Sequence, residues 1–233
     1  MKLEIIIIIS LSAVIFAAAI GFLMIGIGIL HAAKKEKSEK ITLYTMISKD
    51  AMKNPIVFLG DSITEFYRIN EIFFAHYTQN RGVSTDTTDG VLKRMHDHVV
   101  VMNPHKLFLM IGTNDLGLGK KVEYIITNII KIIEELQQEL PQTQIILWSL
   151  CPVNKKVIPG SRFIVGKRKN KDIDAINAGI KTYAEAHGLV FIDINTALKD
   201  DKGNLKQEYT LEGLHLSYPG YIVITDHLKP YIE

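Results

Sequence analysis

The fold of this chain is decided by one short stretch, Ile56-Val57-Phe58-Leu59-Gly60-Asp61-Ser62-Ile63-Thr64. Apolar residues lead directly into Gly-Asp-Ser, and a helical pattern follows. A short apolar run bounded by turn residues is typical of a buried parallel strand. Ligands in open α/β sheets bind at the carboxyl ends of such strands, so Ser62 lies where a functional side chain is expected. A helix cap made by Asp61 or Ser62 explains the same residues equally well.

Beyond this stretch, apolar runs and helical patterns alternate from Pro55 to the end of the chain. Between Lys121 and Leu140, for example, apolar residues recur with the spacing of one helix face. Such alternation predicts right-handed βαβ units and a parallel sheet covered on both faces. The expected strands are 56–60, 76–80, 106–111, 144–150 and 189–194, and the expected helices are 64–74, 87–101, 120–139, 170–187 and 219–232.

The N-terminal segment is apolar almost throughout from Ile5 to Leu30. A helix needs about 20 apolar residues to cross a membrane, whereas the apolar core of a cleaved signal peptide has only about 7–15. We therefore expect an uncleaved membrane anchor over residues 1–33, with its transmembrane helix at about 5–30. A charged, helix-prone linker over 34–54 and a folded domain over 55–233 would follow.

The orientation of this anchor follows less directly from the sequence. Four lysines at positions 34–40 follow the apolar segment, whereas only Lys2 precedes it, and a positive-inside bias would place the C-terminal domain in the cytoplasm. Long domains, however, are translocated largely regardless of such charges. We expect a single-pass protein of the cell membrane and favour an extracytoplasmic C-terminal domain.

Composition excludes several other classes of protein. The net charge of the 233-residue chain is only +2, so nucleic acid is not an expected partner. A single cysteine, Cys151, excludes an internal disulfide framework and a cysteine-rich metal site. Cys151 and Trp148 both flank the end of an expected buried strand, and we expect both to pack in the core.

Polar stretches with reactive side chains recur where further strands should end. Because such ends can meet at one edge of the sheet, these stretches can converge on Ser62. They are Asn80-Arg81-Gly82-Val83-Ser84-Thr85-Asp86-Thr87-Thr88, Ile111-Gly112-Thr113-Asn114-Asp115 and Glu212-Gly213-Leu214-His215-Leu216-Ser217.

The chemistry that these residues could share is acyl transfer. A serine hydroxyl is a weak nucleophile until a base takes its proton, and His215 is the candidate base. Glu212, three residues earlier, is the candidate for orienting the imidazole. The developing oxyanion needs donors, which the Gly82 N–H, the Asn114 amide and the N–H of Ser62 itself could supply. Taken singly, each is more often an ordinary loop residue.

Taken together and in order, these motifs resemble the GDSL/SGNH hydrolase family. The resemblance rests on Gly-Asp-Ser-Ile-Thr, Asn-Arg-Gly, Gly-Thr-Asn-Asp and Gly-Leu-His-Leu, and it covers nearly all of Pro55 to Glu233. Bacterial lysophospholipase-like and platelet-activating-factor acetylhydrolase-like esterases are the most similar branch. The resemblance implies a flavodoxin-like, three-layer α/β/α domain with a central five-stranded parallel sheet, and it implies neither a metal nor an organic cofactor.

The resemblance also implies roles for individual residues. Ser62 would be the nucleophile, His215 the base, and Gly82 and Asn114 would complete the oxyanion hole. Two positions depart from the family pattern: Glu212 replaces the usual aspartate, and Thr85 stands where close relatives often have glycine. The longer side chain of Glu212 leaves open whether a backbone carbonyl orients His215 instead.

The expected function is a membrane-anchored serine esterase that cleaves lysophospholipids or short acyl esters through an acyl-enzyme on Ser62. A carbohydrate O-acetylesterase acting on cell-envelope polysaccharide is the alternative enzyme, and an inactive, membrane-tethered binding module is the alternative without catalysis. An α/β-hydrolase is disfavoured because the sequence has no Gly-x-Ser-x-Gly motif. A basic loop, 155–171, could form a lid or touch the membrane, or it could be a solvated connection.

Overall fold

A computed structural model describes residues 2–232, with side chains described from residue 15 onward. The chain divides into two compact units, one up to Thr42 and one from Leu43 onward. The second unit contains the sheet and all of the residues that the sequence singles out for catalysis.

The central sheet has five strands, all of them parallel, in the order β2-β1-β3-β4-β5. This is the strand order of flavodoxin-like doubly wound sheets. The prediction of a five-stranded parallel sheet is therefore confirmed. The strands are β1 (Ile56–Gly60), β2 (Thr78–Gly82), β3 (Lys106–Met110), β4 (Gln144–Trp148) and β5 (Val190–Ile192). Every residue of β1 is buried, which explains its continuous apolar sequence.

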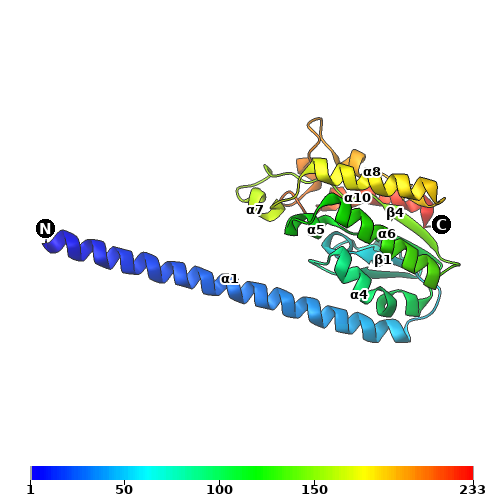
Figure 1. The fold of residues 1–233 in the computed structure, drawn as a ribbon, viewed down its shortest axis with the longest axis horizontal. Coiled ribbons are helices and arrows are strands. Elements are labelled where there is room, and N and C mark those ends of the chain that lie inside the picture. Colours follow the sequence, from blue (N-terminus) through cyan, green and yellow to red (C-terminus); the bar gives the residue numbers. More distant parts are fainter. Residues whose placement is uncertain (1, 233) are drawn as a thin grey trace. The chain divides into compact units, whose positions relative to one another are not determined.

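Helices cover both faces of this sheet. Figure 1 shows α4 (Thr88–His98), α6 (Val122–Glu139) and α8 (Asn170–Ala186) side by side across one face, and α6 contacts both of its neighbours. On the other face, α10 (Tyr218–Leu228) packs against the chain that follows β1. There the rings of Tyr67 and Tyr221 stack with centroids 5.3 Å apart.

The long helices and the strands lie close to their predicted positions, but the shorter elements differ. The single helix expected over 64–74 is two short helices, α2 (Ser62–Glu65) and α3 (Ile69–Ile72), and β2 begins two residues later than predicted. The sequence analysis did not predict α5 (Thr113–Leu118), α7 (Ser161–Val165) or α9 (Asn195–Leu198). Helices of one or two turns are too short to show a hydrophobic period, and β2 is a polar edge strand, Thr-Gln-Asn-Arg-Gly.

Three turns of 3-10 helix complete the secondary structure of the described residues: η1 (Val100–Met102), η2 (Gln207–Tyr209) and η3 (Lys229–Tyr231). The first and the last extend α4 and α10. The single helix predictions over 87–101 and 219–232 therefore cover an α-helix followed by a 3-10 turn in each case.

The N-terminal helix, α1 (Lys2–Asp50), is a candidate membrane span. Its described part from Ile15 is long and apolar enough to cross a membrane, although a signal sequence near an N-terminus meets the same criteria. The last turns of α1, from Leu43 on, belong to the second unit. There the buried guanidinium of Arg81 donates to Ser48 Oγ over 3.1 Å and lies 4.9 Å from the ring centre of Tyr44.

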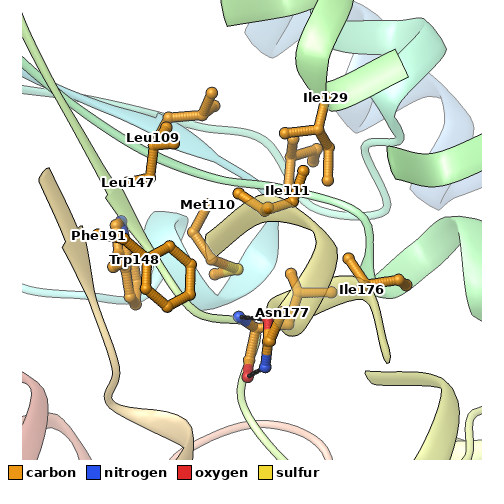
Figure 2. A pocket seen from close by; sticks show the side chains of 11 residues that line it. Leu109, Met110, Ile111, Ile129, Leu147, Trp148, Ile176, Asn177 and Phe191 are labelled. Carbon is orange, nitrogen blue, oxygen red and sulfur yellow. Dashed lines mark hydrogen bonds between the residues drawn. The ribbon is translucent and has the colours of Figure 1, made fainter. Parts of the chain in front are cut away.

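The core between the sheet and helices α6 and α8 contains one small cavity of about 20 Å³ (Figure 2). Its walls are mostly apolar and include Trp148 and Ile176. Trp148 and Cys151 are both buried, so the prediction that they pack in the core is confirmed. Burial also raises the pKa of the Cys151 thiol, which disfavours a thiolate nucleophile there. None of the predicted site residues lines this cavity.

Candidate active site

Ser62 lies at the carboxyl edge of the sheet, as the first residue of α2 directly after β1. The helix cap is made by Asp61, whose Oδ1 accepts the N–H of Ile63 over 3.0 Å. The cap interpretation therefore applies to Asp61 and leaves the Ser62 hydroxyl for another partner. The N–H of Ser62 belongs to the first turn of a helix, where backbone donors have no intrahelical acceptor.

The partner of the Ser62 hydroxyl is His215. Ser62 Oγ lies 3.1 Å from His215 Nε2, and His215 Nδ1 lies 2.6 Å from Glu212 Oε1. The same carboxylate oxygen also accepts the backbone N–H of His215 over 3.0 Å. The structure thus brings Ser62 together with His215, 153 positions later in the sequence, and with Glu212, in the order serine, imidazole, carboxylate.

The loop that carries His215 is held by hydrogen bonds at both ends. Thr210 Oγ1 donates to His215 O over 2.7 Å and accepts the N–H of Gly213 over 2.8 Å. Gly213 adopts a φ of +103°, and a side chain there would collide with the backbone carbonyl of Asn154. Only glycine tolerates both conditions. Glu212 and His215 therefore face each other because the loop between them is compact.

Asn114 lies in the first turn of α5, after β3, with both ends of its amide engaged. Its Nδ2 donates to Asp86 O over 2.9 Å, and its Oδ1 accepts from Arg168 Nη2 over 2.7 Å. These bonds fix the orientation of the amide and use one of its two N–H groups. The second N–H of the Asn114 amide remains as a donor, and its direction is set by the bond that the first N–H makes to Asp86 O.

Gly82 has a different environment from the one that its predicted role requires. Its backbone N–H already donates to Asn80 Oδ1 over 2.8 Å. A side chain at this position would collide with the backbone of Thr64 and Glu65. The geometry therefore does not support Gly82 as an oxyanion donor, and it gives the glycine a packing role between β2 and α2 instead.

The loop after β2 is fixed by a buried ion pair that the sequence analysis did not anticipate. Arg94 Nε lies 2.7 Å from Asp86 Oδ2, and Arg94 Nη2 donates to Gly60 O, just before Asp61. Both side chains are almost fully buried. In the same loop Thr85 adopts a φ of +62°, an unusual and strained conformation for a β-branched residue.

Arg168 is the second residue near the site whose importance the sequence did not reveal. It falls in the basic loop 155–171, which the sequence offers as a lid, a membrane contact or a solvated connection. Its side chain is instead buried and donates to Thr113 O over 2.9 Å as well as to Asn114. Gly117 leaves room for this guanidinium. No local signal distinguishes Arg168 from the exposed lysines beside it.

Asp61 is the most perturbed acid next to the site. Burial raises the pKa of its carboxyl from 3.8 to about 7, although the Ile63 N–H and the charge of Arg168 oppose the shift. Its Oδ2 has no hydrogen-bond partner among the described residues. A buried carboxylate is costly without such partners, so the neutral acid is favoured.

This shift makes stability depend on pH in a defined direction. The folded state holds the Asp61 proton more tightly than the unfolded state does. The stability that this proton contributes is therefore fully present below pH 3.8 and is lost as the pH rises through about 7. We expect Asp61→Asn, which keeps the cap acceptor and cannot ionise, to gain stability relative to the wild type over this interval. Urea unfolding of both proteins at several pH values measures the difference. If the difference in the free energy of unfolding between the two proteins does not change with pH, the raised pKa of Asp61 is contradicted.

Comparisons with known proteins bear on the family and the fold of this chain. A family model described as the GDSL-like lipase/acylhydrolase family matches residues 58–223. A solved Streptococcus pneumonia protein, provisionally described as a platelet activating factor, is 34% identical with a TM-score of 0.79; the match covers 85% of this chain and 94% of that one. A variant of an acetyl-xylooligosaccharide esterase from Geobacillus Stearmophilus shares the fold at 18% identity, a TM-score of 0.61 and coverage of 78% and 95%.

Curated relatives carry a different name. An N-acylneuraminate cytidylyltransferase of Escherichia coli is 22% identical over 86% of this chain, and one of Streptococcus agalactiae is 26% identical over 81% of it. The matches cover 47% and 40% of those proteins, so this chain spans about half or less of their length.

Proposed function

Because this chain belongs to the GDSL-like lipase/acylhydrolase family, we propose that it hydrolyses carboxylic esters through an acyl-enzyme formed on Ser62. The observation that carries the proposal is the continuous contact from Ser62 Oγ to His215 Nε2 and from His215 Nδ1 to Glu212. Such an arrangement lets a base take the hydroxyl proton while a carboxylate holds the imidazole in the required tautomer.

In the first half of the reaction, Ser62 Oγ bonds to the carbonyl carbon of the ester and its proton passes to His215 Nε2. The carbonyl oxygen becomes an oxyanion, for which we propose the Ser62 N–H and the second N–H of Asn114 as donors. When the tetrahedral intermediate collapses, the bond to the alcohol breaks and His215 gives its proton to the leaving oxygen.

In the second half, a water molecule attacks the acyl-enzyme and gives its proton to His215. The bond to Ser62 Oγ then breaks, the proton returns to that oxygen, and the carboxylic acid leaves. Gly82 has no donor role in this scheme, since its N–H is bonded to Asn80. Its contribution is to let β2 approach α2 closely enough to position the loop that carries Asp86.

The experiment that tests the proposal is labelling with a fluorophosphonate probe, which reacts only with an activated serine. We expect one label, on Ser62, in the full-length protein. The absence of a label would favour an inactive binding module. A panel of short acyl esters, lysophospholipids and acetylated glycans then identifies the substrate class, with lysophospholipid or short acyl esters expected to be cleaved.

A carbohydrate O-acetylesterase is the second candidate. It is supported by fold similarity to an acetyl-xylooligosaccharide esterase and an acetyl xylan esterase, and by curated relatives whose names refer to N-acylneuraminate. Under this alternative, acetate would be released from acetylated glycans faster than from simple alkyl acetates. The ester panel separates the two candidates directly.

We also propose that residues 1–33 anchor the protein in the cell membrane, that 34–54 link the anchor to the domain, and that 55–233 form the hydrolase domain. The apolar composition of α1 supports the anchor. The extracytoplasmic side is proposed for the domain, with protease accessibility of the C-terminus in intact cells as the test. The Arg81 contacts with Tyr44 and Ser48 indicate that a truncated protein should retain residues 43–54.

The role of Glu212 gives a prediction of its own. We expect Glu212→Gln to lower kcat by at least about tenfold, because a neutral amide stabilises the imidazolium less well than a carboxylate. Glu212→Asp keeps the charge and should retain most of the activity. Glu208→Gln, an exposed change in the neighbouring turn, is the matched control and should not alter kcat. Wild-type rates for Glu212→Gln between about pH 6 and 8 would show that a Ser62–His215 pair suffices.

A further inference from the structure

A groove of about 250 Å³ lies beside His215 and is lined mainly by apolar side chains. Its floor consists of the buried residues Leu216 and Tyr221. Its walls are Phe66, Leu211 and Tyr218, whose side chains are 50%, 65% and 69% exposed. Large apolar side chains gathered on an exposed surface often mark a binding site.

The floor of this groove is fixed relative to Ser62. Tyr221 donates its hydroxyl proton to the backbone oxygen of Ile63, the residue after Ser62, over 2.9 Å. Its ring stacks on that of Tyr67, which is also buried. A group bound in the groove would therefore keep a constant position relative to the serine.

The groove also lies next to His215 of the proposed catalytic pair. The ring of Phe66 lies 5.3 Å from that of His215, measured between centroids. Leu211, which also lines the groove, donates its backbone N–H to His215 O over 3.1 Å. Two of the residues that line the groove are therefore in contact with His215.

The two halves of an ester leave the reacting carbon in different directions. The oxyanion is directed toward Asn114, which is held by the loops after β2 and β3 and does not contribute to the groove. The leaving alcohol must lie within reach of His215, because His215 supplies its proton. We propose that the groove beside His215 binds the alcohol half of the ester substrate; this assignment rests on the proposed function.

The chemistry of the walls defines the class of alcohol. The guanidinium of Arg68, which also lines the groove, is paired with Glu71 over 3.0 Å at the surface. The pair carries no net charge, and the stem of Arg68 adds apolar surface. At about 250 Å³ the groove is smaller than the pockets that hold whole drug-sized ligands, about 300–1,000 Å³. It therefore suits an uncharged alkyl or aryl alcohol better than a sugar.

The test compares isomeric esters in the full-length protein. Hexyl acetate and ethyl hexanoate have the same atoms, so they partition equally into detergent, but the hexyl chain lies on the alcohol side in one and on the acyl side in the other. Ethyl acetate is the short reference. In the wild type we expect kcat/KM to rise with alcohol length by about fourfold for each methylene that the groove buries.

Leu211→Ala and Tyr218→Ala remove groove walls, and each should lower kcat/KM for hexyl acetate by about tenfold or more. The loss on ethyl acetate and on ethyl hexanoate should be much smaller. Phe74→Ala, which truncates an aromatic side chain that is 84% exposed and outside the groove, is the matched control and should change none of the three rates.

Two results would overturn the assignment of the groove to the alcohol while leaving the proposed ester hydrolysis intact. If the variants lose kcat/KM only on ethyl hexanoate, the groove binds the acyl half of the ester. If they lose kcat/KM equally on all three esters, the groove does not bind the alcohol half specifically. Fluorophosphonate labelling separates these results from failure of the proposed function. If Ser62 is not labelled and none of the esters is cleaved, the proposed function fails, and the groove assignment fails with it.

Discussion

Ser62→Ala is expected to lower kcat for ester hydrolysis by at least about 10⁴-fold. The change removes the oxygen that forms the acyl-enzyme, and no other hydroxyl replaces it beside His215 Nε2 among the described residues. The remaining donors could still polarise an ester, which leaves only weak catalysis of direct attack by water. The loss should appear in kcat, since the groove and the oxyanion donors that bind the substrate are unchanged.

The variant should fold normally. Among the described residues, the Ser62 side chain makes one hydrogen bond, to His215, at the edge of the sheet. Ser149→Ala is a matched control, because the Ser149 hydroxyl accepts the backbone N–H groups of Ile194 and Asn195 over 3.0 and 2.9 Å. That change leaves buried donors unpaired and should lower the free energy of unfolding by about 1–3 kcal/mol without abolishing hydrolysis.

His215→Ala should cause a loss similar to that of Ser62→Ala, and the double variant should be no worse than either single one. Residues that act as a unit do not contribute additively. Hydrolysis at more than a few per cent of the wild-type rate by folded Ser62→Ala protein would rule out Ser62 as the nucleophile. Circular dichroism and thermal unfolding of the same preparation establish that the protein is folded.

Asn114→Ala has the largest expected effect outside the Ser62–His215 pair, a fall in kcat of about 10²–10³-fold with a smaller change in KM. The amide is held between Asp86 O and Arg168, so it needs no reorganisation when the oxyanion forms. The buried cation of Arg168 also withdraws electrons from Oδ1, which makes the amide N–H a stronger donor. Removing this donor should therefore raise the energy of the transition state more than that of the bound ester.

Asn128→Ala is the matched control for this prediction. Asn128 donates to the first turn of α4, with Nδ2 2.9 Å from Thr88 Oγ1 and 3.1 Å from Asp89 Oδ1. Its loss should loosen the start of α4 without removing an oxyanion donor, so kcat should stay within an order of magnitude. A raised KM with an unchanged kcat in Asn114→Ala would instead assign Asn114 to binding of the ground-state ester.

The agreement between sequence and structure is best where the residues repeat a pattern. The apolar run of β1 predicts its bounds, Ile56–Gly60, and the spacing along α6 predicts a helix within two residues of its observed start. Short elements such as α5 and α7 have no period to detect. The edge strand β2 is displaced by two residues because its polar sequence does not mark its ends.

The sequence by itself determined the parallel sheet, the long apolar N-terminal segment and Ser62 and His215 as candidate partners, because strand patterns, motif order and the family resemblance point to them. The contact of Glu212 with His215, which the sequence left open, was decided by the structure. The tertiary structure alone decided what the remaining polar groups do. It engages the N–H of Gly82 with Asn80, buries Arg168 against Asn114 and places an apolar groove beside His215. These facts depend on which atoms meet across distant loops, and a hydrogen bond to a distant partner leaves no local mark on the sequence.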